Sequence, residues 1–311
     1  MTERLVTGQG RLARLGFADP ESAAEQVRTL GPDSADLVES LAFSADPDQA
    51  LERLLELLER SARPDELHDA LRQSMALRER LSAVLGASEA LARFLFRHPD
   101  VWHDLEGFEL QYDDAVAQAG TGDELRIAYH RRLLQVAARD LTAVLSVDEV
   151  SAVLAELAGE TLDAALRIAA AEMPDDAASC RLAVIAMGKC GGCELNYVSD
   201  VDVIFVAEPA DGEDEATALR AGAALASALM RICDEHTGEG TIWPVDPALR
   251  PEGKAGPLVR TLDGHAAYYR RWARTWEFQA LLKARPAAGD LALGEEWLVA
   301  LQPLVWQAAE R

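Results

Sequence analysis

Two aspartates on alternate positions of an apolar run are the residues of this sequence with the clearest chemistry. Asp200 and Asp202 stand in SDVDVIFV, residues 199–206. Side chains two apart on a strand point to the same face, about 6.5–7 Å apart along the chain, so we expect both carboxylates to project together. Neighbouring carboxylates repel each other unless cations separate them, and such oxygen ligands suit Mg²⁺, which keeps water and substrate phosphates in its shell. The spacing therefore predicts a magnesium site for phosphate chemistry.

A third carboxylate and several cations follow further along the chain. Asp246 stands in TIWPVDPALRP, residues 241–251, where it can approach the pair from the next strand. Pro244 and Pro247 on either side predict an edge strand or a bulge, which suits the lip of a site. Two ions about 3.5–4 Å apart can clamp the attacking and leaving oxygens at phosphorus. Basic side chains that can meet phosphate come next, at Arg250, Lys254, Lys283 and Arg285.

Glycines precede the aspartates. Gly191 and Gly192 lie in GKCGGCELNYVSD, and glycine lets backbone N–H groups come close to a phosphate. We expect these two N–H groups, with the hydroxyl of Ser199, to orient phosphate oxygens. The ordinary alternatives are a solvated loop for this motif and a solvated helix face for Glu277, Lys283 and Arg285. The third carboxylate favours a nucleotidyltransferase-type metal site instead.

The same segment contains a Cys-x-x-Cys pair, which suggests two other kinds of chemistry. Cys190 and Cys193 have the spacing of zinc knuckles and thiol redox centres. A zinc site would need Cys233 and His236 as a second pair, at an unusual spacing and near the end of a long helix. A redox centre would need the pair at a helix start, with apolar or proline residues between the cysteines. We therefore expect four ordinary thiols.

Amphipathic patterns predict that residues 1–173 are almost entirely helical. Asp46 and Pro47 begin one helix with an N-cap and a proline in the first turn. Leucines on an i, i+3, i+4, i+7 stripe follow, at Leu51, Leu54, Leu55 and Leu58. A second helix begins near Asp123 and presents one apolar face, made of Leu134, Ala137, Leu141 and Leu145. A third helix runs over about 147–171.

After a polar break at residues 173–179, short β-branched runs alternate with helices. Strands are predicted at residues 181–187, 201–206, 241–249 and 256–261. Helices are predicted at residues 213–235 and 264–284. A small sheet with helices packed on it makes the fold class α+β. We divide the chain into a helical N-terminal region (residues 1–175), a catalytic domain (176–290) and the start of a truncated helical domain (291–311).

Composition restricts the class of partner. The chain has 311 residues, 49% of them hydrophobic, and 30 basic against 53 acidic residues give a net charge of 30 − 53 = −23. Such acidity repels nucleic acid, so phosphate-bearing substrates must meet local cations or a metal. The N-terminus lacks the apolar core of a signal peptide, and the charge-free stretch Leu182–Ala186 is far too short to span a bilayer. The sequence predicts a cytoplasmic protein without a membrane or nucleic-acid partner.

Several strings of the sequence resemble one family. A Gly-Gly pair, a spacer and Asp-x-Asp are typical of the polymerase-β-like nucleotidyltransferases. The string MGKCGGCELNYVSDVDVIF (residues 187–205) resembles the bifunctional glutamine synthetase adenylyltransferase/adenylyl-removing enzymes. Further similar strings are VDPALRPEGKAGPLV (245–259), WEFQALLKAR (276–285) and the helical segments 88–105 and 124–141. The resemblance covers most of the chain from about residue 75, and its three catalytic strings together are highly specific.

The resemblance implies the adenylyl-removing part of a two-part enzyme. The family has two similar catalytic halves, one adding AMP to a tyrosine of glutamine synthetase and one removing it, and the removing half comes first. A motif near residue 200 behind a helical region, with Glu194-Leu195-Asn196 within it, is similar to that half. The implied reaction is a phosphorolysis: inorganic phosphate attacks the tyrosyl-AMP of adenylylated glutamine synthetase and gives ADP and free tyrosine. The implied metal is Mg²⁺, held by Asp200, Asp202 and Asp246.

Further partners implied by the resemblance are the missing adenylylating half and a PII-type signal protein. The sequence departs from the family pattern at Cys190, where leucine is more frequent, so the Cys-x-x-Cys spacing is accidental. Ala248 replaces a frequent arginine and Pro244 another polar residue, which leaves more of the phosphate binding to Arg250. No residue is required as a general base, because phosphoryl chemistry of this kind depends on positioning and electrostatics.

Three alternative functions stay open. The closest is the reverse reaction, AMP transfer from ATP to glutamine synthetase, because one site geometry serves both directions. A non-catalytic module that binds glutamine synthetase or a PII-type protein would tolerate loss of the aspartates. A small-molecule nucleotidyltransferase would not need the long helical arm.

Overall fold

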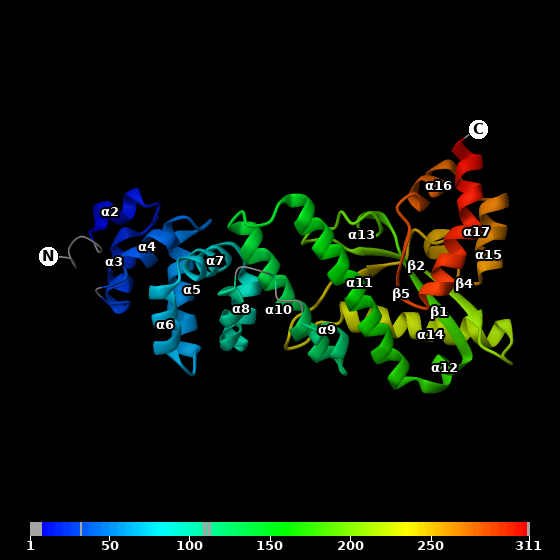
Figure 1. The fold of residues 1–311 in the computed structure, drawn as a ribbon, viewed down its shortest axis with the longest axis horizontal. Helices are drawn as coiled ribbons and strands as arrows, with labels where there is room; N and C mark the ends of the chain where they lie inside the picture. Colours follow the sequence, from blue (N-terminus) through cyan, green and yellow to red (C-terminus); the bar gives the residue numbers. More distant parts are fainter. Residues whose placement is uncertain (1–7, 32, 108–109, 111–112, 310–311) are drawn as a thin grey trace. The chain divides into compact units, whose positions relative to one another are not determined.

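The computed structural model describes residues 8–31, 33–107, 110 and 113–309 of the chain. The chain divides into two compact units. One comprises Met1–Tyr112 and His130–Val147, and the other comprises Asp113–Tyr129 and Asp148–Arg311. Helices build the first unit, and a small mixed sheet with helices builds the second (Figure 1). The predicted α+β class is therefore confirmed, whereas the predicted domain boundaries stay predictions.

Short helices build the first unit. Their bounds are α2 (Gln9–Arg14), α3 (Pro20–Thr29), α4 (Ala35–Ala42), α5 (Pro47–Arg60), α6 (Pro64–Gln73), α7 (Met75–Ala87), α8 (Glu89–Arg97) and the 3₁₀ helix η1 (Pro99–Leu105). α5 begins as predicted, because the Asp46 carboxylate accepts a hydrogen bond from Gln49 N (3.0 Å) and Pro47 occupies the first turn. Its buried leucines are Leu51, Leu54 and Leu57.

Two long helices follow. Their bounds and those of their short neighbours are α9 (Ala115–Gln118), α10 (Gly122–Leu141), α11 (Val147–Glu172) and α12 (Pro174–Ser179). The helices predicted from Asp123 and over 147–171 are confirmed. The prediction that the first of them carries Leu145 is wrong. α10 ends earlier because Ala143 has a φ of 55° and the N–H group of Leu145 turns back to the Arg139 carbonyl (3.3 Å).

The sheet of the second unit has five strands among the described residues. They are β1 (Cys180–Ala186), β2 (Val201–Pro209), β3 (Val245–Asp246), β4 (Val259–Arg260) and β5 (Arg285–Gly289). β1 lies between β2 and β5 and is antiparallel to both, whereas β3 and β4 pair with β2 in parallel. The strands predicted at 181–187 and 201–206 are confirmed. Those predicted at 241–249 and 256–261 are only two residues long.

The structure differs from the sequence prediction at three further places. A short helix, α13 (Gly188–Gly191), replaces the loop expected after β1. The helix predicted over 264–284 is two helices, α15 (Leu262–Arg271) and α16 (Thr275–Leu281). The second begins anew because the Glu277 carboxylate accepts a hydrogen bond from Arg274 N (2.7 Å). β5 was not predicted, since its sequence RPAAG has no β-branched residue.

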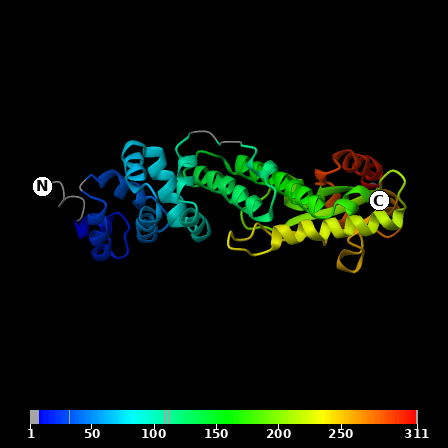
Figure 2. The same ribbon diagram turned by 90° about the horizontal axis from the view of Figure 1, so that it is seen from below.

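Helices cover both faces of the sheet. α14 (Glu215–Asp234) packs on one face, where a side-chain carbon on Gly222 would meet Ala207 Cβ of β2 at 2.9 Å. α15, α16 and α17 (Leu291–Ala309) pack on the other face, around a core that includes Ile185, Ile204 and Trp297. Figure 2 shows the same ribbon from below, with α14 in yellow. α14 is long and apolar enough to cross a membrane, but 50% of that stretch is buried, as in a core helix.

Candidate active site

The pairing of β2 with β3 places two of the predicted aspartates side by side. The strands run parallel, and their register aligns Val201 with Val245 and Asp202 with Asp246. Aligned residues on neighbouring strands point to the same face of a sheet, so the two carboxylates share one face. Asp200 directly precedes β2 and is exposed, whereas Asp202 and Asp246 are half-buried.

The electrostatics of Asp202 show that the charges of Asp200 and Asp246 act on it. Burial raises the pKa of Asp202 above its ordinary value, and the negative charges of Asp200 and Asp246 raise it further. The positive charge of Lys189 opposes them. The structure thus brings the three predicted aspartates together, and it adds a lysine that the sequence reasoning did not single out.

The donor set fits a hard cation such as Mg²⁺ in type. Three carboxylates gather at the start of β2, and one Asp246 oxygen is fixed by a hydrogen bond from Ala248 N (2.8 Å). In the described part of the chain, no three His, Cys, Asp or Glu side chains form a ready group of metal ligands. The aspartates therefore offer part of a coordination shell. Mg²⁺ commonly completes such a shell with water and phosphate oxygens.

Gly188 lets the α13 turn pack directly on Asp202. Its φ is 53°, and a side-chain carbon there would lie 2.3 Å from the Asp202 carboxylate oxygen. The N–H group of Met187 also donates to the Asp202 carbonyl (2.8 Å). Only glycine fits both the left-handed backbone and the close carboxylate.

The glycines that were predicted to bind phosphate have a different role in the structure. Gly191 N donates to the Met187 carbonyl (2.8 Å) and Gly192 N to the Gly188 carbonyl (3.1 Å), so both N–H groups are used inside the turn. A side-chain carbon on Gly191 would lie 2.0 Å from the Lys283 carbonyl oxygen. The reason given from the sequence, N–H groups open to phosphate, is therefore wrong. Gly191 allows the turn to pack against the chain ahead of β5.

Arg250 lies near Asp246, but its guanidinium N–H groups donate to backbone carbonyls. Its guanidinium donates to the carbonyls of Pro247 (2.8 Å), Pro257 (3.2 Å) and Gly256 (3.3 Å). Burial lowers its pKa, and the Asp246 charge opposes that shift. Arg250 thus braces the loop that follows β3. Lys254, on the 3₁₀ turn η2 (Gly253–Ala255) of that loop, is exposed.

Lys283 and Arg285 tie the chain before and within β5 to the α13 turn. Lys283 pairs with Glu194, and Arg285 Nη2 donates to the Cys190 carbonyl (3.2 Å). Arg285 Nε is buried without a hydrogen-bond partner. Neither residue lies on a helix, contrary to the prediction. Glu277 is buried and caps α16, so it does not lie on a solvated helix face.

Lys189 is a residue that the sequence reasoning missed, and Asn196 was named there only as part of the segment that resembles the removing half. Lys189 Nζ donates to Asn196 Oδ1 (2.9 Å), and Asn196 Nδ2 donates to the Val198 carbonyl (3.0 Å). Ser199 is half-buried at the entrance to β2. The signal for Lys189 was its position within the motif, directly after the glycine that packs on Asp202.

The four cysteines are free thiols in the structure. Cys190 is buried, which raises the pKa of its thiol to about 11, and burial raises that of Cys233 to about 12. A thiolate is the form that binds metal or exchanges disulfides, so burial disfavours both roles at these two positions. Cys193 is exposed, with a φ of 56°. That the pair has no metal or redox role stays a prediction.

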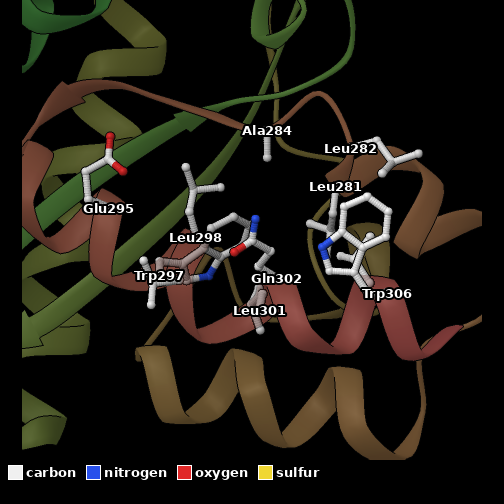
Figure 3. A pocket seen from close by; sticks show the side chains of 11 residues that line it. Leu281, Leu282, Ala284, Glu295, Trp297, Leu298, Leu301, Gln302 and Trp306 are labelled. Carbon is white, nitrogen blue, oxygen red and sulfur yellow. The ribbon is translucent and has the colours of Figure 1, made fainter. Parts of the chain in front are cut away.

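An apolar groove lies apart from the aspartates, between the end of α16 and α17 (Figure 3). Its volume is about 350 Å³, and side chains such as Leu281, Leu298 and Trp306 line it. None of the predicted site residues does. Glu295 of α17 also lines it, but residues 297–309 of the same helix contain no charged residue.

A mixed sheet that presents three aspartates beside a glycine-containing turn defines a nucleotidyltransferase-type domain. The chain belongs to the glutamate-ammonia ligase adenylyltransferase family, whose model matches residues 77–299.

Its similarity to curated proteins agrees with that family. It is 56% identical over 318 residues to a bifunctional glutamine synthetase adenylyltransferase/adenylyl-removing enzyme of Streptomyces avermitilis, covering 97% of this chain and 32% of that protein. The protein of the same name from Cutibacterium acnes is 44% identical over 332 residues, covering 96% of this chain and 33% of that protein. The chain spans about a third of the length of these relatives.

Proposed function

We propose that this chain removes AMP from a tyrosine of glutamine synthetase by phosphorolysis. An oxygen of inorganic phosphate forms a new bond to the α-phosphorus of tyrosyl-AMP, and the bond from that phosphorus to the tyrosine oxygen breaks. The products are ADP and the free tyrosine, which takes up a proton. The observation that carries the proposal is the alignment of Asp202 with Asp246 beside Asp200. The relatives' names supply the substrate protein and both directions of AMP transfer.

In this proposal the three aspartates hold Mg²⁺, which when bound supplies positive charge near the phosphoryl oxygens and the departing tyrosine oxygen. The phenol group of tyrosine has an unperturbed pKa near 10. The phenoxide can therefore leave when its charge is stabilised, and a strong acid is not needed. Asp246 is oriented for this by Ala248 N. Lys283 and Arg285 add positive charge where they contact the α13 turn and its loop. The chain's own contribution is to position and neutralise charged groups.

The removing direction is supported by the segment Glu194-Leu195-Asn196, which resembles that of the removing half. Each of these residues has a distinct contact. Glu194 pairs with Lys283, Leu195 is buried with 5% exposure, and Asn196 accepts a hydrogen bond from Lys189. Together they hold the loop that leads into Asp200.

The test is the identity of the nucleotide product. The chain is incubated with adenylylated glutamine synthetase and Mg²⁺, with and without inorganic phosphate. We expect ADP and unmodified tyrosine, formed only with phosphate, and no product from an Asp202→Asn variant. Release of AMP would indicate hydrolysis instead. Incorporation of label from ATP into unmodified glutamine synthetase would show that the chain adds AMP.

A further inference from the structure

Lys189 stands on the turn that packs directly against the aspartates. Its neighbour Gly188 lies so close to Asp202 that a side-chain carbon would come within 2.3 Å of a carboxylate oxygen. Lys189 is therefore fixed one residue away from that contact. Its side chain is exposed, so a ligand can reach the ammonium group.

The ammonium of Lys189 has a neutral partner. Nζ donates to Asn196 Oδ1 at 2.9 Å, and Asn196 is itself held by its bond to the Val198 carbonyl (3.0 Å). Among the described residues, the structure records no carboxylate within 4.0 Å of this ammonium. A lysine has three N–H donors, so two stay available when one is given to Asn196.

Three other cations of the site use their donors differently. Lys283 is paired with the Glu194 carboxylate, and Arg250 donates to three backbone carbonyls. Arg285 gives one donor to the Cys190 carbonyl. Lys189 thus combines an accessible ammonium, a neutral anchor and a place beside the aspartates.

The use of lysine in this chain points the same way. Of 30 basic residues only three are lysines, so 30 − 3 = 27 are arginines. The three are Lys189 and Lys283, which lie on or against the α13 turn and its loop, and Lys254 in the loop after Asp246. Lysine is a compact point charge, whereas arginine is a planar fork. A chain that uses arginine almost everywhere has lysine at this site.

We propose that Lys189 binds a phosphate group at the aspartate site and that Asn196 is its positioning residue. The proposal rests on the proposed function, because it assigns the phosphate of that reaction a protein ligand. The phosphate is either the α-phosphoryl group of the AMP or the attacking inorganic phosphate. In both cases the free N–H donors of Lys189 bind phosphate oxygens while Asn196 keeps the ammonium beside Asp202.

The test measures binding by calorimetry, with Mg²⁺ present, of three probes: AMP, adenosine and inorganic phosphate. Lys189→Met removes the charge, and Lys189→Arg keeps it. Arg220→Met is the matched control, since Arg220 is an exposed cation on α14 whose side-chain bonds are to Ala216 and Thr217. We expect Lys189→Met to lower the affinity for the phosphate-bearing probe by about tenfold, which corresponds to the loss of one charge-assisted hydrogen bond. Lys189→Arg should weaken it less, and adenosine affinity should not change.

The probe whose affinity falls in Lys189→Met identifies the phosphate group that Lys189 binds. Loss confined to inorganic phosphate assigns Lys189 to the attacking group, and loss for AMP assigns it to the α-phosphoryl group. Unchanged affinity of both probes in Lys189→Met, with binding intact in the unmodified chain, would overturn the Lys189 proposal and leave the proposed function standing. Failure of the unmodified chain to bind either probe would count against both.

The positioning role of Asn196 has its own readout. Asn196→Ala should lower the affinity for the same probe, because the ammonium of Lys189 loses the hydrogen bond that positions it. In the Lys189→Met background the Asn196→Ala change should have no further effect on affinity, since Asn196 acts through Lys189. An equal loss in both backgrounds would show that Asn196 acts on the loop and not on the lysine.

Discussion

The ionised carboxylate of Asp202 is electrostatically unfavourable in the metal-free chain. Its carboxylate is half-buried and lies beside two others, and these surroundings raise its pKa. A carboxyl group with a raised pKa binds its proton more tightly in the folded state than in the unfolded state. Its ionisation therefore destabilises the fold, and this effect appears as the pH rises from the unfolded pKa through the higher folded pKa.

We predict that Asp202→Asn melts higher than the unmodified chain in metal-free buffer at neutral pH. The change removes one of three mutually repelling charges and keeps the shape of the side chain. A rise in Tm of about 2 °C corresponds to the modest free energies expected for a half-exposed group. Added Mg²⁺ should raise the Tm of the unmodified chain more than that of the variant, and differential scanning calorimetry measures both. Equal responses to Mg²⁺ would argue against Asp202 as a ligand.

At the scale of elements, α15 depends on a histidine that stays neutral. His265 has 1% exposure, its Nδ1 lies 3.1 Å from the Thr261 carbonyl, and its ring meets Trp297 of α17 edge-on at 5.6 Å. Burial lowers its pKa to about 4. The unfolded chain, with a pKa near 6.5, takes up this proton first. The stability present above pH 6.5 is therefore lost as the pH falls toward 4.

We predict that this single group costs about 2 kcal/mol of unfolding free energy between pH 7.5 and pH 5. Urea denaturation of the unmodified chain and of His265→Gln, at both pH values, measures the difference. The variant should lose less stability on acidification, because glutamine has no proton to gain. Its lower stability at pH 7.5 does not affect the comparison, which uses only the change with pH. Parallel losses in the two proteins would contradict the assignment.

The elements that the sequence predicted well are those with local signals. Asp46 and Pro47 mark the start of α5, and the apolar run 201–206 lies within β2. β5 has no such signal. Its strand character comes from pairing with β1, about 100 residues away in the sequence, with a register shift between Val184 and Ile185. β3 is short because Pro244 and Pro247 flank it and lack N–H groups.

The carboxylates of the site could be predicted, because their spacing is visible in the sequence. The alternation of Asp200 and Asp202 and the position of Asp246 sufficed to place three acidic groups together. The glycines were located correctly but given the wrong reason, since the hydrogen bonds of Gly191 and Gly192 close a turn that the sequence did not predict. Lys189 required the structure, because the close packing of Gly188 on Asp202 that fixes its position cannot be read from the sequence.

At the scale of the whole molecule, the chain spans about a third of the length of the relatives it matches. Its relatives carry two activities in their names, and the family match begins at residue 77, within α7. The similarity to the Streptomyces avermitilis protein covers 97% of this chain, so it includes residues ahead of that match. The first unit is thus shared with that relative, although the chemistry proposed here lies in the second.

The uncharged run of α17 has a consequence for the behaviour of the chain in solution. Val299 and Trp306 are 68% and 60% exposed on a molecule whose net charge is −23. The repulsion between two such molecules reaches about 30 Å at 0.01 M salt and only about 3 Å at 1 M. Salt therefore removes the force that keeps two apolar helix ends apart.

We predict that this chain is monomeric in dilute buffer and self-associates as salt is added, which sedimentation velocity would show as a rising sedimentation coefficient. Trp306→Gln should suppress the rise, whereas Trp272→Gln should not, since Trp272 is 72% exposed but lies outside the groove. A sedimentation coefficient independent of salt would contradict this. The colloidal stability of this molecule thus depends on two opposing features. Its net negative charge keeps the molecules apart, and the uncharged end of α17 lets them associate once salt screens that charge.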